Sequence, residues 1–100
     1  MSPTNRRLDD AELQAAMKIL EGWSLDDEQH LTRSFQFASF AGAMGFMAAA
    51  AIEADKLDHH PNWSNVYDRV EVTLWSHDLG GVSALCVSLA RKMNELAPPP

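Results

Sequence analysis

The spacing of apolar residues along this chain changes from helical to strand-like and back, twice over, and this alternation limits the folds open to it. Apolar residues three or four apart predict helices, and apolar residues at every second position predict half-buried strands. In chain order the pattern predicts helix, strand, strand, helix, strand, strand, helix. Because such elements must bury their apolar faces against each other, we expect an α+β two-layer sandwich. Its four-stranded antiparallel sheet would have three helices packed on one face.

The first predicted helix spans about residues 10–20. Asp9 and Glu12 form an acidic version of a capping box at its start. Its apolar side recurs at helical spacing through Leu13, Met17 and Leu20. A hairpin is expected next, because two short period-2 segments flank a turn at residues 26–29. Arg33 is the discordant member of its apolar face, which otherwise contains Trp23, Leu25, Leu31, Phe35 and Phe37.

The second helix is expected to begin after Ser39, a residue type that caps helix N-termini. Its apolar stripe consists of Ala43, Phe46, Met47, Ala50, Ala54 and Leu57. Gly42 and Gly45 each lower helix propensity by about 1 kcal/mol relative to alanine, so they indicate the close approach of another backbone. The helix should end before His59, because Pro61 disfavours helical geometry in the residue before it.

A period-2 pattern returns at Val66, with a turn expected at residues 68–69. One face of the second strand consists of Val70, Val72 and Leu74, and the opposite face of Glu71, Thr73, Trp75 and His77. Ser83 is expected to cap the last helix, whose stripe contains Leu85, Leu89, Met93 and Leu96. The sheet therefore has one apolar face and one that exposes aromatic and histidine side chains.

A chain of 100 residues with 46% hydrophobic composition has the size of one domain, here expected to span residues 1–100 with flexible tails at 1–7 and 97–100. Domains of this size are marginally stable alone, so self-association is expected. The formal net charge of −6 provides no basic field for phosphates. This argues against direct nucleic-acid binding.

The single cysteine, Cys86, cannot form an internal disulfide, and residues 1–7 lack the apolar core of a secretory signal. We therefore expect a cytoplasmic protein. The most apolar stretch, residues 35–52, contains Gln36 and Ser39 and leads directly into charged residues. A buried helix explains it better than a membrane span.

His59, His60 and His77 are the candidate functional residues. The first two follow a helix and the third closes a strand, so all three imidazoles can converge at one edge of the sheet. Imidazole, with an ordinary pKa near 6.5, can give or take a proton at neutral pH, which suits an elimination of water.

Two other interpretations of the histidines stay open. Histidines at a helix end often only cap carbonyl groups or interact with the helix dipole. Three histidines can also bind a metal, although the chain has no H-x-x-x-H motif or cysteine pair. Nearby, Cys86 fits a small buried hydrophobe. Trp63 and Tyr67 could pack the hairpin or stack on a flat heterocycle.

Three stretches resemble the pterin-4a-carbinolamine dehydratase family, namely residues 55–63 (DKLDHHPNW), 65–67 (NVY) and 70–77 (VEVTLWSH). The resemblance extends over nearly the whole chain. The family's signature is met by Asp55, His59, His60, Pro61, Tyr67 and His77.

This resemblance implies dehydration of 4a-hydroxytetrahydropterin to quinonoid dihydropterin by acid and base catalysis, without a metal or organic cofactor. It also implies a homodimer or homotetramer. The implied pterin pocket is lined by Asp58, His59, His60, Trp75, Ser76 and His77. There Asp58 is expected to orient an imidazole or fix its tautomer. Residues that would support it are Asp55, Pro61, Trp63, Tyr67 and Cys86.

Cys86 is a departure, because family members usually have an aspartate there. Trp75 and Ser76 also replace a small residue and a threonine that are common in the family. An alternative function follows: a catalytically weakened member that acts as a protein-binding or dimerisation module, as the family's second role with a transcription factor implies.

Overall fold

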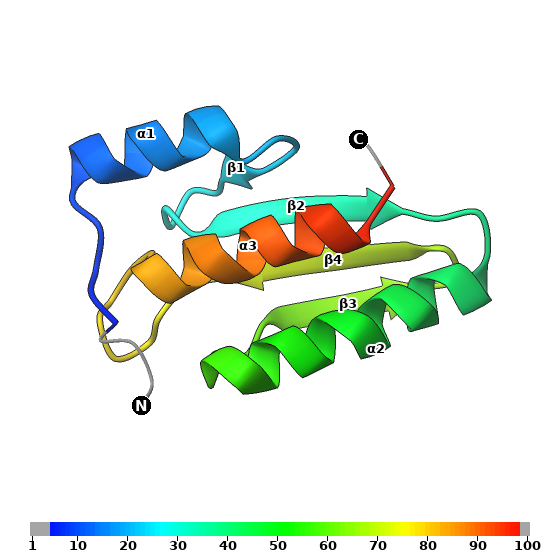
Figure 1. Ribbon diagram of the computed structural model, residues 1–100. Coiled ribbons are helices and arrows are strands. Elements are labelled where there is room, and N and C mark those ends of the chain that lie inside the picture. The colour runs from blue at the N-terminus through cyan, green and yellow to red at the C-terminus, as the bar shows by residue number, and fades with distance from the viewer. Residues whose placement is uncertain (1–4, 99–100) are drawn as a thin grey trace.

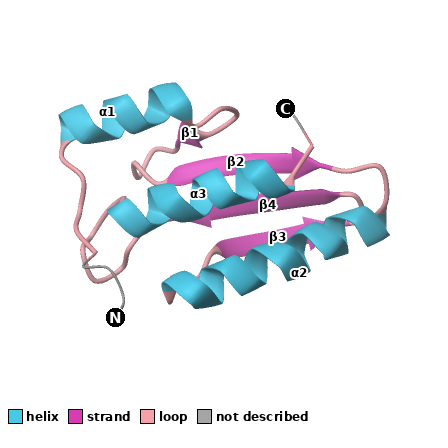
Figure 2. Cartoon of the chain, viewed as in Figure 1, coloured by secondary structure: helices cyan, strands magenta, loops and turns pink. Residues whose placement is uncertain are grey.

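The computed structural model describes residues 5–98, which form a single sheet with three helices (Figures 1 and 2). Its elements are α1 (Asp10–Ile19), β1 (Ser24–Leu25), β2 (Leu31–Gln36), α2 (Phe40–Leu57), β3 (Asn62–Val66), β4 (Arg69–Leu74) and α3 (Ala84–Leu96). The strands pair antiparallel in the order β1-β2-β4-β3. The predicted α+β class and element order are confirmed.

The helices α2 and α3 pack side by side across one face of the sheet, while α1 lies beside the β1 edge (Figure 1). The sheet contributes to the core through the fully buried side chains Leu31, Phe35, Val70, Val72 and Leu74. The helices contribute Leu13, Ala16, Ala43, Phe46, Ala50, Ala54, Leu85, Leu89, Ala90 and Met93. Within residues 5–98 we find no helix with the length and hydrophobicity needed to cross a membrane.

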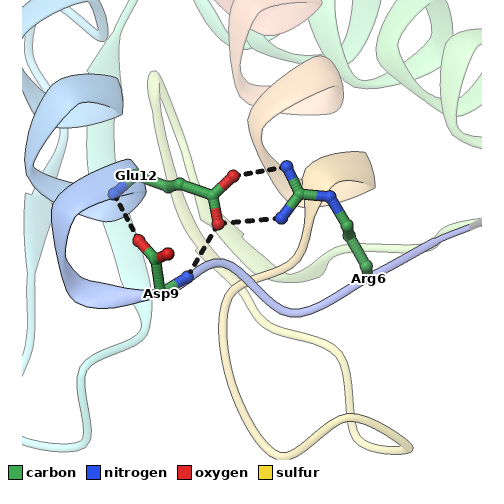
Figure 3. Close-up of polar contacts among 3 residues, drawn as sticks. All are labelled: Arg6, Asp9 and Glu12. Carbon is green, nitrogen blue, oxygen red and sulfur yellow. Dashed lines mark hydrogen bonds and ion pairs between the residues drawn. The ribbon is translucent and has the colours of Figure 1, made fainter.

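The capping box predicted for α1 is present (Figure 3). The Asp9 carboxylate accepts from the Glu12 amide at 2.8 Å, and the Glu12 carboxylate accepts from the Asp9 amide at 3.0 Å. The Arg6 guanidinium donates to both Glu12 oxygens and, with the Asp9 amide, lowers the pKa of Glu12 to about 2. Local sequence therefore determines the start of α1.

The start of α3 differs from the prediction. Ser83 occupies the N-cap position, but its side chain accepts no hydrogen bond from a backbone amide of the helix, and its hydroxyl lies 3.3 Å from the Cys86 sulfur instead. Instead, the Asn5 side chain accepts a hydrogen bond of 3.1 Å from the Leu85 amide. The prediction that Ser83 caps α3 through its side chain is wrong, because the buried hydroxyl faces the core.

The predicted tails fall partly outside the described residues, since 1–4 and 99–100 are not among them. Residues 5–8 lie along the segment before α3, where the Ala84 amide donates to the Arg6 carbonyl and the Leu8 amide to the Val82 carbonyl, both at 3.0 Å. At the other end, the Ala97 amide donates to the Met93 carbonyl.

Two local predictions need correction. The turn between β3 and β4 lies at residues 67–68, one position earlier than predicted, because the side-chain amide of Asn65 donates to the Tyr67 and Arg69 carbonyls. The close approach expected at the helical glycines is also not found within residues 5–98. A Cβ added to Gly45 would meet no atom within 4 Å, and the nearest neighbours of Gly42 belong to its own N-terminal cap.

Candidate active site

The C-terminus of α2 positions the histidine pair. Asp58 ends the helix in the left-handed conformation, with φ 50° and ψ 43°, and its amide donates to carbonyls of the last turn. The His59 amide also donates to the Ala54 carbonyl, at 3.1 Å. This cap turns the chain away from the helix axis, and Pro61 then leads into β3. The backbone that carries the two imidazoles is thus held at the C-terminal end of α2.

The end of β4 positions the third histidine. A bridge between Ser76 and Gly81, with the Ser76 amide donating to the Gly81 carbonyl at 2.8 Å, continues the extended conformation beyond Leu74. Side chains therefore keep alternating. Leu74 and Ser76 are buried, whereas Trp75 is half-buried and His77 is exposed.

One open cavity of about 340 Å³ joins these two segments. Its lining consists of Asp58, His59, His60, Trp75, Ser76, His77 and Asp78. The structure thus brings together the six residues expected to line a pocket and adds Asp78. Within residues 5–98, no three His, Cys, Asp or Glu side chains are grouped in a way that could hold a metal ion.

The imidazole of His59 contacts a buried thiol. Its Nε2 lies 3.1 Å from the sulfur of Cys86, which is fully buried and also contacts the Ser83 hydroxyl. Burial lowers the pKa of His59, with a smaller contribution from the neighbouring His60, and burial raises the pKa of Cys86. At neutral pH both groups are therefore uncharged, and His59 is free to accept a proton.

His60 has a different partner. Its Nε2 lies 3.0 Å from a carboxylate oxygen of Asp55, in the last turn of α2, and both side chains are exposed. From the sequence, Asp58 was the residue expected to orient an imidazole. Among the side-chain contacts of the described chain, Asp55 does so instead, because residue 58 adopts the cap conformation.

The His77 ring packs against Trp75, with ring centroids 4.4 Å apart and an interplanar angle of 49°. Trp75 in turn stacks face to face on His30, at 4.3 Å and 1°. Sequence reasoning missed His30. It lies directly opposite Trp75 because the β2–β4 register pairs Leu31 with Leu74, and the sequence does not reveal that register.

None of the five expected support residues is among those that line the cavity. Asp55 and Cys86 contact its histidines, and the other three lie as follows. Pro61 only starts the segment leading to β3. Trp63 lies opposite Val72 on the core-facing side of β3 and packs against the hydrophobic core. Tyr67 is 64% exposed in the turn at the far end of β3. Strand alternation and strand length explain these placements.

A second cavity, of about 370 Å³, lies over β1, β2 and β4. Its lining consists of Gly22, Ser24, Thr32, Arg33, Ser34, Glu71, Val72 and Thr73. It contains hydroxyl groups, a guanidinium and a carboxylate, but no imidazole. The histidine cavity is therefore the better candidate for proton transfer.

The sequence of this chain is similar to a known protein family and to individual relatives. Residues 6–96 match the family model for pterin 4 alpha carbinolamine dehydratase. Proteins of Brucella ovis and Brucella canis, each named "Putative pterin-4-alpha-carbinolamine dehydratase", are 50% identical over 92 residues, which cover 91% of this chain and 95% of theirs.

A solved structure is also similar. The crystal structure of transcriptional coactivator/pterin dehydratase from Brucella melitensis superposes with a TM-score of 0.90 and 49% identity, and the match covers 93% of this chain and all of that one. Both the sequence match and the fold extend over almost the entire chain. The chain therefore belongs to the pterin-4a-carbinolamine dehydratase family.

Proposed function

We propose that this chain dehydrates 4a-hydroxytetrahydropterin to quinonoid dihydropterin and water, as a recycling step for tetrahydropterin in the cytoplasm. The main observation in favour is that His59, His60 and His77 line one cavity, together with Trp75, in a chain of this family. An open cavity of about 340 Å³ accommodates a flat bicyclic ligand.

The reaction needs one acid and one base. The acid protonates the 4a-hydroxyl, the C4a–O bond breaks as the N5 lone pair forms a C4a=N5 double bond, and the base removes the proton from N5. His59 suits the base, because burial lowers its pKa and leaves it neutral at neutral pH. His60 and His77, both exposed to the cavity, are the candidates for the acid.

Cys86 then serves as a positioning residue for His59. Its thiol lies at hydrogen-bond distance from the ring and can hold it in place without adding a charge. An aspartate at this position would instead stabilise the imidazolium. The cysteine therefore favours a neutral His59 and is compatible with activity.

The test is a kinetic assay in which an aromatic amino-acid hydroxylase generates the carbinolamine and ultraviolet absorbance follows its disappearance. Purified wild type should accelerate that step, and His59→Ala should remove most of the acceleration. Gln36→Ala is a matched control, because Gln36 is exposed at the far end of β2. A wild-type rate equal to that of the buffer would reject the proposal.

A second candidate function is protein binding, since the Brucella melitensis neighbour is named as both a coactivator and a dehydratase. The outer side of α2 supports it, with Phe40 50% exposed, Met44 37% and Ile52 59%. Null kinetics together with capture of a stable partner, lost in Phe40→Ser, would favour this function. Full activity without a partner would favour the first.

We also propose that the chain forms a homodimer or homotetramer. The β3 strand pairs only with β4, so its other edge is free within the described chain, and α2 exposes apolar side chains. Light scattering at micromolar concentration should give a mass of at least twice 11.1 kDa. A mass of the monomer alone would contradict this expectation.

A further inference from the structure

His30 is the fourth histidine of the chain, and the turn that precedes β2 holds it rigidly. The Asp26 carboxylate accepts hydrogen bonds from the His30 and Glu28 amides, both at 2.9 Å. The Asp26 amide donates to the His30 carbonyl at 3.0 Å. Such an aspartate-centred turn fixes the backbone of His30 relative to the sheet.

From this fixed backbone the imidazole covers one face of the Trp75 indole. The interplanar angle of 1° and centroid distance of 4.3 Å describe a parallel stack. Directly opposed residues of antiparallel strands are the pairs that interact most closely across a sheet. The contact therefore follows from the strand register and is part of the fold.

The three cavity histidines differ in what orients their rings. His59 contacts Cys86 and His60 contacts Asp55, each through a ring nitrogen. No hydrogen bond to the His77 side chain is found within residues 5–98, and its close aromatic neighbour is Trp75. The indole of Trp75 thus contacts the His77 ring and the His30 ring.

We propose that His30 is a positioning residue that acts through Trp75 to hold the His77 imidazole at the cavity. The consequence for turnover rests on the proposed dehydratase function. Because His30 does not itself line the cavity and His77 is a candidate for the acid, loss of His30 should lower kcat more than it raises KM.

Two variants distinguish the effect of an aromatic ring stacked on Trp75 from any effect specific to the imidazole of His30. His30→Ala removes the ring, whereas His30→Phe keeps an aromatic ring against Trp75. We expect His30→Ala to lower kcat about threefold to tenfold, the factor that corresponds to the loss of one aromatic pair, with KM within about twofold of wild type. His30→Phe should restore most of the rate. Asp27→Asn, an exposed change in the same turn, is the matched control and should behave as wild type.

A second readout does not depend on activity. The Cε1–H resonance of His77, assigned by loss of the peak in His77→Gln, senses the ring current of the Trp75 indole. It should move in His30→Ala and stay near its wild-type position in His30→Phe, while the resonances of His59 and His60 stay unchanged.

The two readouts distinguish the two proposals. If wild type shows no dehydration at all, the proposed function fails, and the His77 resonance alone decides whether His30 positions that ring. An unmoved His77 resonance in His30→Ala would overturn the inference. An unchanged kcat in His30→Ala, measured on an active wild type, would overturn it equally.

Discussion

The two ends of α3 each hold a polar cluster against the sheet, but the two clusters are built from different kinds of hydrogen bond. Near the C-terminal end, Asn94 accepts from the Trp23 indole at 2.7 Å and from the Arg33 guanidinium, and donates to the Glu21 carbonyl at 3.0 Å. The guanidinium also lies 4.1 Å above the ring of Phe35. The Trp23 indole and the Arg33 guanidinium thus both donate to the same side-chain oxygen of Asn94.

Near the N-terminal end of α3, the His59 imidazole contacts the thiol of Cys86, which forms only weak hydrogen bonds. Weak bonding leaves His59 able to change its protonation, whereas the strong bonds around Arg33 fix one arrangement. One end of the helix is thus built to stabilise the fold, and the other contacts the proposed catalytic residue His59. It also explains Arg33, the charged residue that did not fit the apolar face of the hairpin.

The largest effect is expected from removal of an imidazole at the N-terminal end. His59→Ala and His77→Ala should each slow dehydration at least about tenfold, the low side of usual acid and base contributions, while the protein stays folded. The measurement is the kinetic assay with circular dichroism as a check of folding. Wild-type rates in both variants would contradict the assignment of these residues.

Removal of Asn94 tests the opposite end. Asn94→Ala leaves the Trp23 indole without its acceptor and the Arg33 guanidinium with only the Glu21 carbonyl at 3.3 Å, and should lower the free energy of unfolding by about 1 to 3 kcal/mol. Urea denaturation measures this, with the exposed α3 residue Ser88, changed to alanine, as control. Because the cluster lies away from the cavity, kcat of the folded variant should equal that of wild type. A large loss of kcat would mean that the two ends are not independent.

Replacing Cys86, which contacts His59 near the N-terminal end of α3, should alter the pH dependence of the dehydration rate. The lowered pKa of His59 keeps it neutral below its ordinary value of 6.5, so wild type should stay active as pH falls through 6.5. A carboxylate in Cys86→Asp should raise that pKa and move the acid limb of the rate profile upward by about 1 to 2 pH units. Cys86→Ser, which adds no charge, should leave the limb in place. Equal profiles for the two variants would count against His59 as the base.

The smallest effect is expected from the ion pair between Arg6 and Glu12. It joins α1 to residues 5–8, the segment that lies beside the N-terminal end of α3. The pKa of Glu12 is lowered to about 2 by Arg6, so this pair stabilises the fold above the ordinary value of 4.5 and ceases to do so as pH falls through about 2. Glu12→Gln should therefore melt slightly below wild type at pH 7, and the difference should shrink between pH 5 and pH 2. A difference in Tm that does not vary with pH would show that the ion pair contributes nothing.

Local signals in the sequence were sufficient for much of the fold. The capping box at Asp9, the Ser39 cap and the alternation from Val70 to His77 each depend on neighbouring residues, and each is present in the structure. By contrast, β3 begins at Asn62 rather than Val66, because its side chains alternate only between half-buried and exposed and leave no apolar signal.

Other features depend on residues far apart in the chain. The Asn5 cap of α3 joins positions 80 residues apart, and the stack of His30 on Trp75 requires the strand register. The family signature identified the three cavity histidines, but it could not indicate that Asp55 rather than Asp58 contacts His60. That choice follows from the left-handed cap at the end of α2.

The central claim is that three imidazoles surround one flat bicyclic ligand. The most direct measurement is an NMR titration of the wild-type protein with a stable dihydropterin, following the imidazole Cε1–H resonances. The account predicts that the resonances of His59, His60 and His77 shift together along one saturation curve with a single Kd. Shifts of only one of them, or of none at saturating ligand, would contradict it.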